Sequence, residues 1–219
     1  MEYLVTMTTQ VPDRTSEETI AEVRAREAAH TAELAAQGHI LRLWRPPRAP
    51  GEWRTVGLFA AANRADLERI LAGMPLRIWR SDEVIELAHH ENDPPGPNQR
   101  AAPPARDQTG LEFFTFFITA IPDGTAGEVI EEARAGEGRR THELAAEGHL
   151  IRLWQLPAWP DESHALGLWR AEDAAQIREM LDSLPMAPWL TEEIVPLVPH
   201  PSDPATPGSR PEAAPAGRP

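Results

Sequence analysis

The chain contains no cysteine and no lysine. Without cysteine it has no disulfide bond, no thiolate nucleophile and no cysteine ligand for a metal ion. Without lysine it lacks the amine that forms a Schiff base with a carbonyl substrate or with pyridoxal phosphate. The side chains that remain for proton transfer are glutamate, aspartate, histidine and the single tyrosine, Tyr3.

Positive charge is also scarce, since 21 arginines face 34 acidic residues and the formal net charge is −13. A chain of that sign repels a polyphosphate backbone, so a nucleic-acid partner is not expected. No stretch of about 18 apolar residues exists that would span a bilayer. The first residues, MEYLVTMTTQ, alternate in polarity and do not resemble a secretory signal, so we expect a cytoplasmic protein without a membrane partner.

An internal repeat is the most informative feature that is present. The segment GHILRLWRPP at 38–47 returns as GHLIRLWQLP at 148–157, and an offset of 110 residues aligns residues 3–94 with 113–204 without a gap. About a third of the aligned positions are identical, which indicates a duplicated unit. We therefore predict repeat 1, a Pro-rich linker, repeat 2 and a disordered tail, with the boundaries 1–94, 95–110, 111–204 and 205–219.

Each repeat predicts the order strand, helix, strand, strand, helix, strand. In repeat 1 an alternating segment precedes a helix that begins after a Thr or Ser cap and stops at Gly38. Two segments rich in β-branched and aromatic residues predict strands, Asn63 caps a second helix, and a last strand closes the unit. This βαββαβ order is that of a ferredoxin-like fold, which packs both helices on one face of its sheet.

The other face of such a sheet needs a cover. The predicted strand LEFFTFFI at 111–118 is apolar on both sides, which favours a second sheet as that cover. We therefore predict an α+β protein in which two tandem ferredoxin-like units form an intramolecular pseudo-dimeric α+β barrel. Further assembly of this internal pair into a homo-oligomer stays open.

A glutamate lies on the apolar stripe of the first helix in each repeat. Residues 20, 23, 27, 31 and 34 share one helix face, and this face is apolar except for Glu27 and Thr31; the second repeat keeps the acid as Glu137. A carboxylate that faces a core either has a raised pKa and shuttles protons, or is held in an ion pair. Both interpretations stay open, and Glu27 and Glu137 are the candidate catalytic bases.

The repeated strand supplies candidate partners for these acids. Alternation divides it into two faces, one with Ile40, Arg42 and Trp44, the other with His39, Leu41, Leu43 and Arg45. An arginine and an indole that point the same way suit a planar carboxylate ligand, because the guanidinium grips the carboxylate while the indole packs on its body. The alternative is a core tryptophan beside an arginine that is the counter-ion of Glu27. The predicted substrate-binding residues are Arg42, Arg152, Trp44, Trp154 and Arg45.

His39 and His149 follow the glycine that ends each first helix. They are candidates for acid–base catalysis, and the alternative is that they only cap helix carbonyl groups. The cluster HHEND at 89–93 carries metal-ligating side chains, but the second repeat keeps only His200 and Asp203 of it, so no metal site is predicted. Phosphate-binding glycine patterns are absent as well, so a nucleotide cofactor is not expected.

The second repeat, from EGHLIRLWQ at 147–155 through LPMAPW at 184–189 to the His-Pro at 200–201, resembles the muconolactone isomerase family. Both repeats match along nearly their full length. The resemblance implies a ferredoxin-like fold, two units assembled into an α+β barrel, and a cofactor-free isomerase. Such an enzyme moves a double bond in an unsaturated lactone acid by removing a proton next to a carbonyl group and returning it elsewhere.

The resemblance also places the family's functional residues. Its helix glutamate falls on Glu27 and Glu137, and its Leu-Trp-Arg motif falls on residues 43–45. The chain departs from this pattern at Gln155, which replaces the arginine of the motif, and at Arg42 and Arg152, which stand where the family has a histidine. Differences between the two copies, such as Arg45 against Gln155, lead to the hypothesis that one site is active and the other structural.

The first functional hypothesis is therefore a cofactor-independent isomerase, or a related cyclase or dehydratase, in bacterial secondary metabolism or aromatic catabolism. Its substrate is a small unsaturated lactone or carboxylated molecule, with Glu27 or Glu137 as the base. Two alternatives stay open: a non-catalytic barrel that binds a small ligand, and a cofactor-free oxygenase, which fold analogy alone supports.

Overall fold

The structure is a computed structural model of the chain, and it describes residues 1–47, 53–94, 110–157 and 163–206. The predicted linker 95–110 and tail 205–219 lie outside the described residues, apart from Gly110, Ala205 and Thr206.

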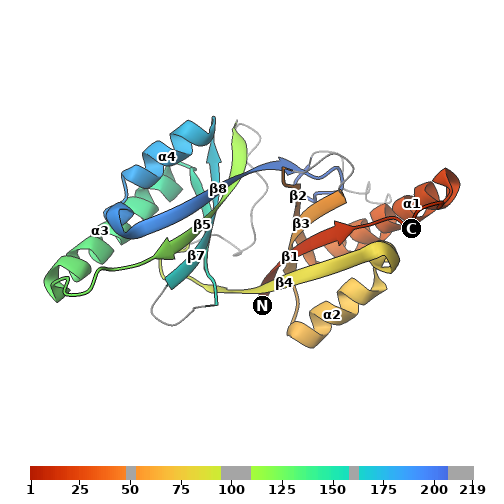
Figure 1. Cartoon of the computed structure of the whole chain (residues 1–219), viewed down its shortest axis with the longest axis horizontal. Coiled ribbons are helices and arrows are strands. Elements are labelled where there is room, and N and C mark those ends of the chain that lie inside the picture. The colour runs from red at the N-terminus through yellow and green to blue at the C-terminus, as the bar shows by residue number, and fades with distance from the viewer. Residues whose placement is uncertain (48–52, 95–109, 158–162, 207–219) are drawn as a thin grey trace, which may run out of the picture.

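The order of elements predicted for each repeat is confirmed (Figure 1). Repeat 1 contains β1 (Glu2–Thr9), α1 (Glu17–Ala36), β2 (Ile40–Arg45), β3 (Trp53–Ala60), α2 (Arg64–Gly73), the 3-10 helix η1 (Pro75–Trp79) and β4 (Arg80–His89). Repeat 2 contains β5 (Leu111–Thr119), α3 (Gly127–Ala146), β6 (Leu150–Gln155), β7 (Ser163–Ala171), α4 (Ala174–Asp182), the 3-10 helix η2 (Ala187–Trp189) and β8 (Leu190–Pro199). The two 3-10 helices were not predicted; in each, a proline at the first or second position fixes a backbone angle that suits a helical start.

The predicted helix ends in repeat 1 are also confirmed. The Ser16 side chain accepts a hydrogen bond from the Thr19 N–H and so caps α1, and Asn63 caps α2 in the same way. Gly38 follows α1 with φ 79°, in the left-handed region that favours glycine. Among the described helices, none is both long and apolar enough to cross a membrane.

The eight strands form a closed barrel in the order β1-β3-β2-β8-β5-β7-β6-β4. Within each repeat the strands pair antiparallel, and the long last strand of each continues into the other repeat (Figure 1). The end of β8 pairs with β2, and the end of β4 pairs with β6. These two seams confirm the predicted pseudo-dimeric α+β barrel.

The core has three parts. The middle cluster takes residues from all eight strands and from no helix, so it fills the barrel; it includes Trp44, Trp154 and Phe114. The other two clusters lie between the strands of one repeat and the helices of that repeat. Each sheet is therefore buried on both faces, and the second repeat covers the face that the first leaves bare, as predicted.

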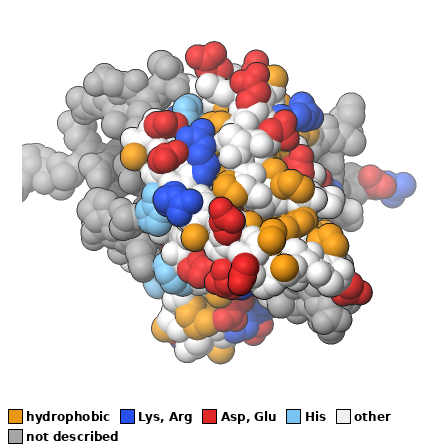
Figure 2. All heavy atoms as spheres, turned by 90° about the vertical axis from the view of Figure 1, so that its left-hand side faces the viewer, with side chains coloured by type: hydrophobic (Ala, Val, Ile, Leu, Met, Phe, Trp, Pro, Cys, Tyr) orange, Lys and Arg blue, Asp and Glu red, His pale blue; other side chains and the backbone are white. Residues whose placement is uncertain are grey.

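Figure 2 shows the face that repeat 2 presents, and acidic side chains are spread over it among hydrophobic and uncharged ones, with arginine and histidine side chains between them.

The predicted alternation of residues 39–45 is wrong at its start. Ile40 packs with Leu43 in the helix-facing cluster, whereas Leu41 packs against the barrel interior. The reason is a register shift between Ile40 and Arg42 in the pairing of β2 with β3, which turns the first residues of the strand over. The same shift occurs in β6. After the bulge the prediction holds, since the Arg42 guanidinium lies 4.7 Å from the Trp44 ring on the same face.

Arg42 is almost completely buried, at 1% exposure, in a network that joins the two repeats. Its guanidinium donates to both oxygens of Glu112 on β5, at 3.1 and 2.7 Å, and to Asp203 after β8, at 3.1 to 3.2 Å. The Trp44 indole N–H donates to Glu112 at 2.6 Å. The alternative in which Arg42 is the counter-ion of Glu27 is therefore wrong, because both partners of Arg42 come from the other repeat.

The same network occurs again, shifted by 110 residues. Arg152 donates to Glu2 at 2.8 Å and to Asp93 at 3.2 Å, and the Trp154 indole N–H donates to Glu2 at 2.6 Å. Each repeat thus contributes one arginine and one tryptophan to one network and two acids to the other. The two carboxylates around each arginine compensate for the hydration that the guanidinium loses on burial. This compensation holds only while both carboxylates stay in place.

We expect the Arg42→Met substitution to lower the free energy of unfolding by about 3–5 kcal/mol, because it removes the guanidinium that pairs with the buried carboxylates of Glu112 and Asp203. Equilibrium denaturation in urea measures this change. The control is Arg69→Met, which removes an exposed helix ion pair with Asp66 and changes the free energy of unfolding by less than about 1 kcal/mol. Similar losses in both variants would contradict the importance of the network.

Candidate functional site

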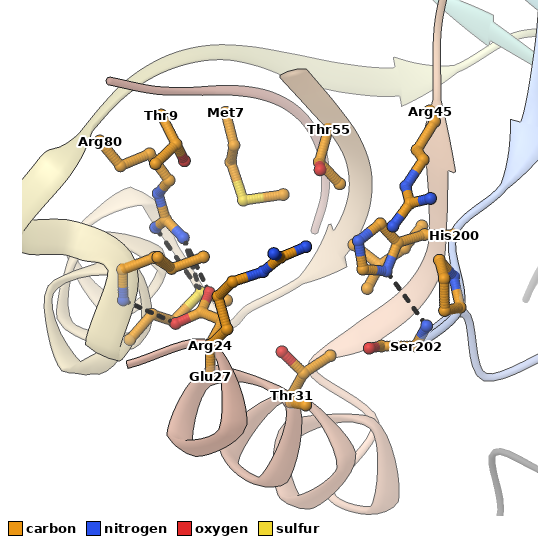
Figure 3. Close-up of a pocket in the computed structure, with 15 residues that line it drawn as sticks. Met7, Thr9, Arg24, Glu27, Thr31, Arg45, Thr55, Arg80, His200 and Ser202 are labelled. Atoms are coloured by element: carbon orange, nitrogen blue, oxygen red, sulfur yellow. Dashed lines mark hydrogen bonds and ion pairs between the residues drawn. The ribbon is translucent and has the colours of Figure 1, made fainter. Parts of the chain in front are cut away.

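A pocket of about 270 Å³ lies between α1 and the strands of repeat 1 (Figure 3). Its charged and titratable lining comes from four places in the chain. Helix α1 supplies Arg24 and Glu27, β2 supplies Arg45, β4 supplies Arg80, and the turn after β8 supplies His200. The pocket of repeat 1 is therefore completed by a residue of repeat 2.

Glu27 lies on the inward-facing stripe of α1, and its side chain is 13% exposed. One carboxylate oxygen accepts a hydrogen bond from the Leu76 N–H at 2.8 Å, and the other accepts from the Arg80 guanidinium at 3.2 Å. The ion-pair interpretation thus describes Glu27, with Arg80 as the partner. Each carboxylate oxygen thus has one donor, and the position of the carboxylate in the pocket wall leaves it accessible to a ligand.

Arg80 is itself held from a second side. Its Nε donates to Asp82 at 2.6 Å, and its guanidinium also contacts the Met74 sulfur at 3.6 Å. Two carboxylates therefore share this buried cation. The guanidinium holds Glu27 in place, because its own position is fixed by Asp82 and by the surrounding apolar side chains.

His200 is the second titratable group of the pocket. Its backbone N–H donates to the Leu43 carbonyl at 2.9 Å, which ties the turn to β2, and its Nδ1 accepts from the Ser202 N–H at 3.1 Å. Burial, together with the positive charges of Arg45 and Arg24, lowers the pKa of His200 to about 4. The imidazole is therefore neutral near pH 7, and with Nδ1 as an acceptor its proton lies on Nε2.

Two further arginines make this end of the pocket electropositive. The Arg24 guanidinium lies 4.9 Å from the centre of the Trp53 ring, a cation–π contact that restricts its position. Arg45 lies close enough to His200 to depress its pKa. Figure 3 shows Arg24, Arg45 and His200 directed toward the same part of the pocket. Such a set of donors suits an anionic group of a ligand.

The structure brings only some of the predicted catalytic and substrate-binding residues together in the pocket. Glu27 and Arg45 line the pocket, whereas Arg42, Arg152, Trp44 and Trp154 lie in the two buried networks.

The two predicted histidines are bound to backbone groups. The Nδ1 of His39 donates to the Ala60 carbonyl at 3.1 Å, and that of His149 donates to the Arg170 carbonyl at 3.0 Å.

Three charged or titratable residues of the lining were missed as site residues. Arg24 precedes Glu27 by three positions on the same helix face, a signal that the sequence does carry. His200 belongs to the His-Pro of the family pattern, but nothing in local sequence shows that it reaches the other repeat. Arg80 differs from its counterpart Leu190, which marks it as a point of divergence.

The corresponding position in repeat 2 is chemically different. The Glu137 carboxylate accepts from the Met186 N–H at 3.1 Å, as Glu27 does from Leu76, but Leu190 replaces the arginine partner. Burial raises the pKa of the Glu137 carboxyl, and the hydrogen bond from Met186 offsets this only in part. Gln155 stands where repeat 1 has Arg45. The two acids thus occupy similar positions with different electrostatic surroundings.

Metal-ligating side chains do not gather in the described part of the chain: it holds no group of three or more histidine and acidic residues placed to bind a metal ion. The HHEND segment instead forms a turn in which the His90 Nδ1 accepts from the Asn92 N–H, as His200 does from Ser202.

Comparison with known sequences places each repeat in one family. The family model described as Muconolactone delta-isomerase matches residues 1–93 and again residues 111–203. Muconolactone Delta-isomerase 1 of Acinetobacter lwoffii is 32% identical over 90 residues, which are 41% of this chain and 91% of that protein. Muconolactone Delta-isomerase of Cupriavidus pinatubonensis is 29% identical over 90 residues, which are 41% of this chain and 95% of that protein.

Comparison with solved structures supports the fold alone, because the sequence identities are low. A chlorite dismutase from Candidatus Nitrospira defluvii aligns with a TM-score of 0.56 and 10% identity, over 90% of this chain and 91% of that one. A heme-binding protein from Thermus thermophilus aligns with a TM-score of 0.52 and 10% identity, over 90% of this chain and 92% of that one. Both alignments run through the two repeats, as expected for a shared two-unit barrel.

The lowered pKa of His200 predicts a pH-dependent stability. The unfolded chain protonates this imidazole near pH 6.5 and the folded protein only near pH 4, so the folded state binds fewer protons between these values. The free energy of unfolding therefore falls as the pH decreases through this window, by up to about 3 kcal/mol from this group. Urea denaturation at pH 7 and pH 4.5 checks this.

The His200→Gln variant isolates the contribution, since it removes only the titrating ring. We expect it to lose less stability than the wild type between the two pH values, while the exposed-site control His89→Gln follows the wild type. Parallel curves for all three proteins would show that His200 titrates normally.

Proposed function

This chain belongs to the muconolactone delta-isomerase family, and on that premise we propose that it is a cofactor-independent isomerase of a small unsaturated lactone or carboxylated substrate. The observation that carries the proposal is the pocket of repeat 1, in which a glutamate fixed by two donors shares a cavity with arginines and a neutral histidine. Its volume of about 270 Å³ lies just below that of small-molecule sites, which span roughly 300–1,000 Å³. A compact substrate fits it best.

Glu27 is the base of the proposed reaction. It removes a proton from the carbon next to the substrate carbonyl, the electron pair moves into the conjugated system, and the same carboxyl returns the proton to another carbon. The Leu76 N–H and Arg80 use one acceptor position on each carboxylate oxygen, so a lone pair remains for the substrate proton. General base catalysis of this kind contributes about 10²- to 10⁴-fold to a rate.

The negative charge that develops on the carbonyl oxygen needs donors that are already in place. His200 supplies one, because its neutral ring with Nδ1 bonded to Ser202 presents Nε2–H as a donor. Arg24 and Arg45 supply positive charge for a substrate carboxylate, and the Trp53 ring limits the freedom of Arg24. A small planar acid would thus be held at its carboxylate while its ring lies beside Glu27.

We place the active site in repeat 1 alone. The substitutions Gln155 and Leu190 remove two cations from the equivalent region of repeat 2. Without an arginine partner, Glu137 has a raised pKa and is the weaker candidate for a base that must be ionised. Repeat 2 contributes to catalysis through His200, which lies in the pocket of the other repeat.

We expect Glu27→Gln to lower kcat/KM by about 10²- to 10⁴-fold, since glutamine keeps the shape and cannot accept the proton. The matched control Glu137→Gln removes the equivalent acid of repeat 2 and leaves kcat/KM near the wild-type value. The assay follows isomerisation, and deuterium exchange from solvent, of an unsaturated five-membered lactone that carries a carboxymethyl group.

The outcomes separate the hypotheses. Equal losses in the two variants would contradict a single active site. A wild-type protein that binds the lactone acid and exchanges no deuterium would be a ligand-binding barrel and not an isomerase.

A further inference from the structure

Thr31 and its copy Thr141 occupy the same position on equivalent helices, and each is 3% exposed. The Thr141 hydroxyl donates to a carbonyl of its own helix, with the Glu137 oxygen at 2.8 Å and the Gly138 oxygen at 3.1 Å. The Thr31 hydroxyl makes no hydrogen bond to any described residue, and Thr31 lines the pocket of repeat 1. Two copies of one residue thus use their hydroxyl groups differently.

A buried threonine in a helix ordinarily bonds to the carbonyl three or four residues earlier, because that acceptor is always in reach. The Thr31 hydroxyl does not take this option. Figure 3 shows its oxygen directed from α1 into the pocket, on the stretch of wall between Glu27 and Ser202. The Thr31 oxygen is not among the buried polar atoms without a partner in the described residues, so it is reached from the pocket, and its hydrogen-bonding capacity is free for a group of a ligand.

Other hydroxyl groups line the same space. Thr9 on β1 is 9% exposed, and its hydroxyl also makes no hydrogen bond to a described residue. Thr55 on β3 lines the pocket too, and its counterpart in repeat 2 is Ala165. The pocket therefore offers hydroxyl groups from both the helix side and the sheet side, beyond the cations that bind a carboxylate.

We propose that Thr31 binds a hydroxyl group of the substrate, so that the substrate is a hydroxylated unsaturated lactone acid. This inference rests on the proposed function and deepens it. A substrate hydroxyl is the matching chemistry, because it both donates and accepts, as the Thr31 hydroxyl does.

The helix geometry sets the order of the groups. Arg24, Glu27 and Thr31 lie on one face of α1, and a rise of 1.5 Å per residue separates Thr31 from Glu27 by about 6 Å and Arg24 from Glu27 by about 4.5 Å in the opposite direction. The Arg24 side chain, however, extends toward Arg45 and His200, so its guanidinium and the Thr31 hydroxyl lie on the same side of Glu27 (Figure 3). A substrate hydroxyl at Thr31 would therefore lie on the same side of the proton-losing carbon as the carboxylate that these arginines hold.

The test uses two probes that differ only in one hydroxyl group on an unsaturated lactone acid, and the variants Thr31→Val and Thr141→Val. Valine keeps the branched shape and removes the hydroxyl. For the wild type and Thr141→Val we expect kcat/KM to favour the hydroxylated probe by about 10- to 100-fold. For Thr31→Val we expect this preference to fall to nearly one, through loss of activity on the hydroxylated probe.

Thermal unfolding checks that the variants fold and reports on the two hydroxyl groups in the free protein. Thr141→Val loses a hydrogen bond, so its Tm falls by about 2–4 °C, whereas that of Thr31→Val does not fall. A preference that Thr31→Val retains, or an equal loss on both probes, would overturn the proposal.

Dissociation constants of both probes, measured by calorimetry with the Glu27→Gln variant, separate this inference from the proposed function. A preference in binding that Thr31→Val abolishes supports the hydroxyl site even where the wild type isomerises neither probe, and then only the proposed reaction fails. Isomerisation of both probes at equal kcat/KM retains the reaction and refutes the hydroxyl site. Failure of both probes to bind counts against both.

Discussion

The buried arginine of each repeat, held by two acids of the other repeat, is the interaction on which the rest of the structure depends. Arg42 and Arg152 tie the repeats together at the two seams of the barrel. Asp203, which bonds to Arg42 and to the Leu43 N–H, also fixes the turn that begins at His200. The network therefore holds the repeats together and also places a histidine of repeat 2 beside the helix of repeat 1, in the pocket that we propose as the active site.

Duplication separates the demands of folding from those of chemistry. The buried networks are the same in both halves, residue for residue at an offset of 110, because each barrel seam needs its own. The surroundings of the helix glutamate differ, with Arg80 in one half and Leu190 in the other. A unit that must pair with an identical copy cannot make such a change on one side only, whereas a fused pair can.

The sequence predicts what local periodicity and repetition encode, and it misses what long-range contacts decide. Strand and helix order, the caps at Ser16 and Asn63 and the barrel follow from patterns within each repeat and from the need to cover a bare sheet face. The inward position of Glu27 follows from helix periodicity. The bulge in β2 and the acids that bind Arg42 do not, because they depend on the register between strands far apart in the chain.

A single position explains much of the difference between the two glutamates. At residue 80 an arginine, fixed by Asp82, gives Glu27 a donor and a positive charge. At the equivalent residue a leucine offers neither, so burial acts on Glu137 with only the Met186 N–H to oppose it, and its pKa rises. The leucine therefore leaves Glu137 without the cation that contacts Glu27, and burial is the larger influence on the pKa of Glu137.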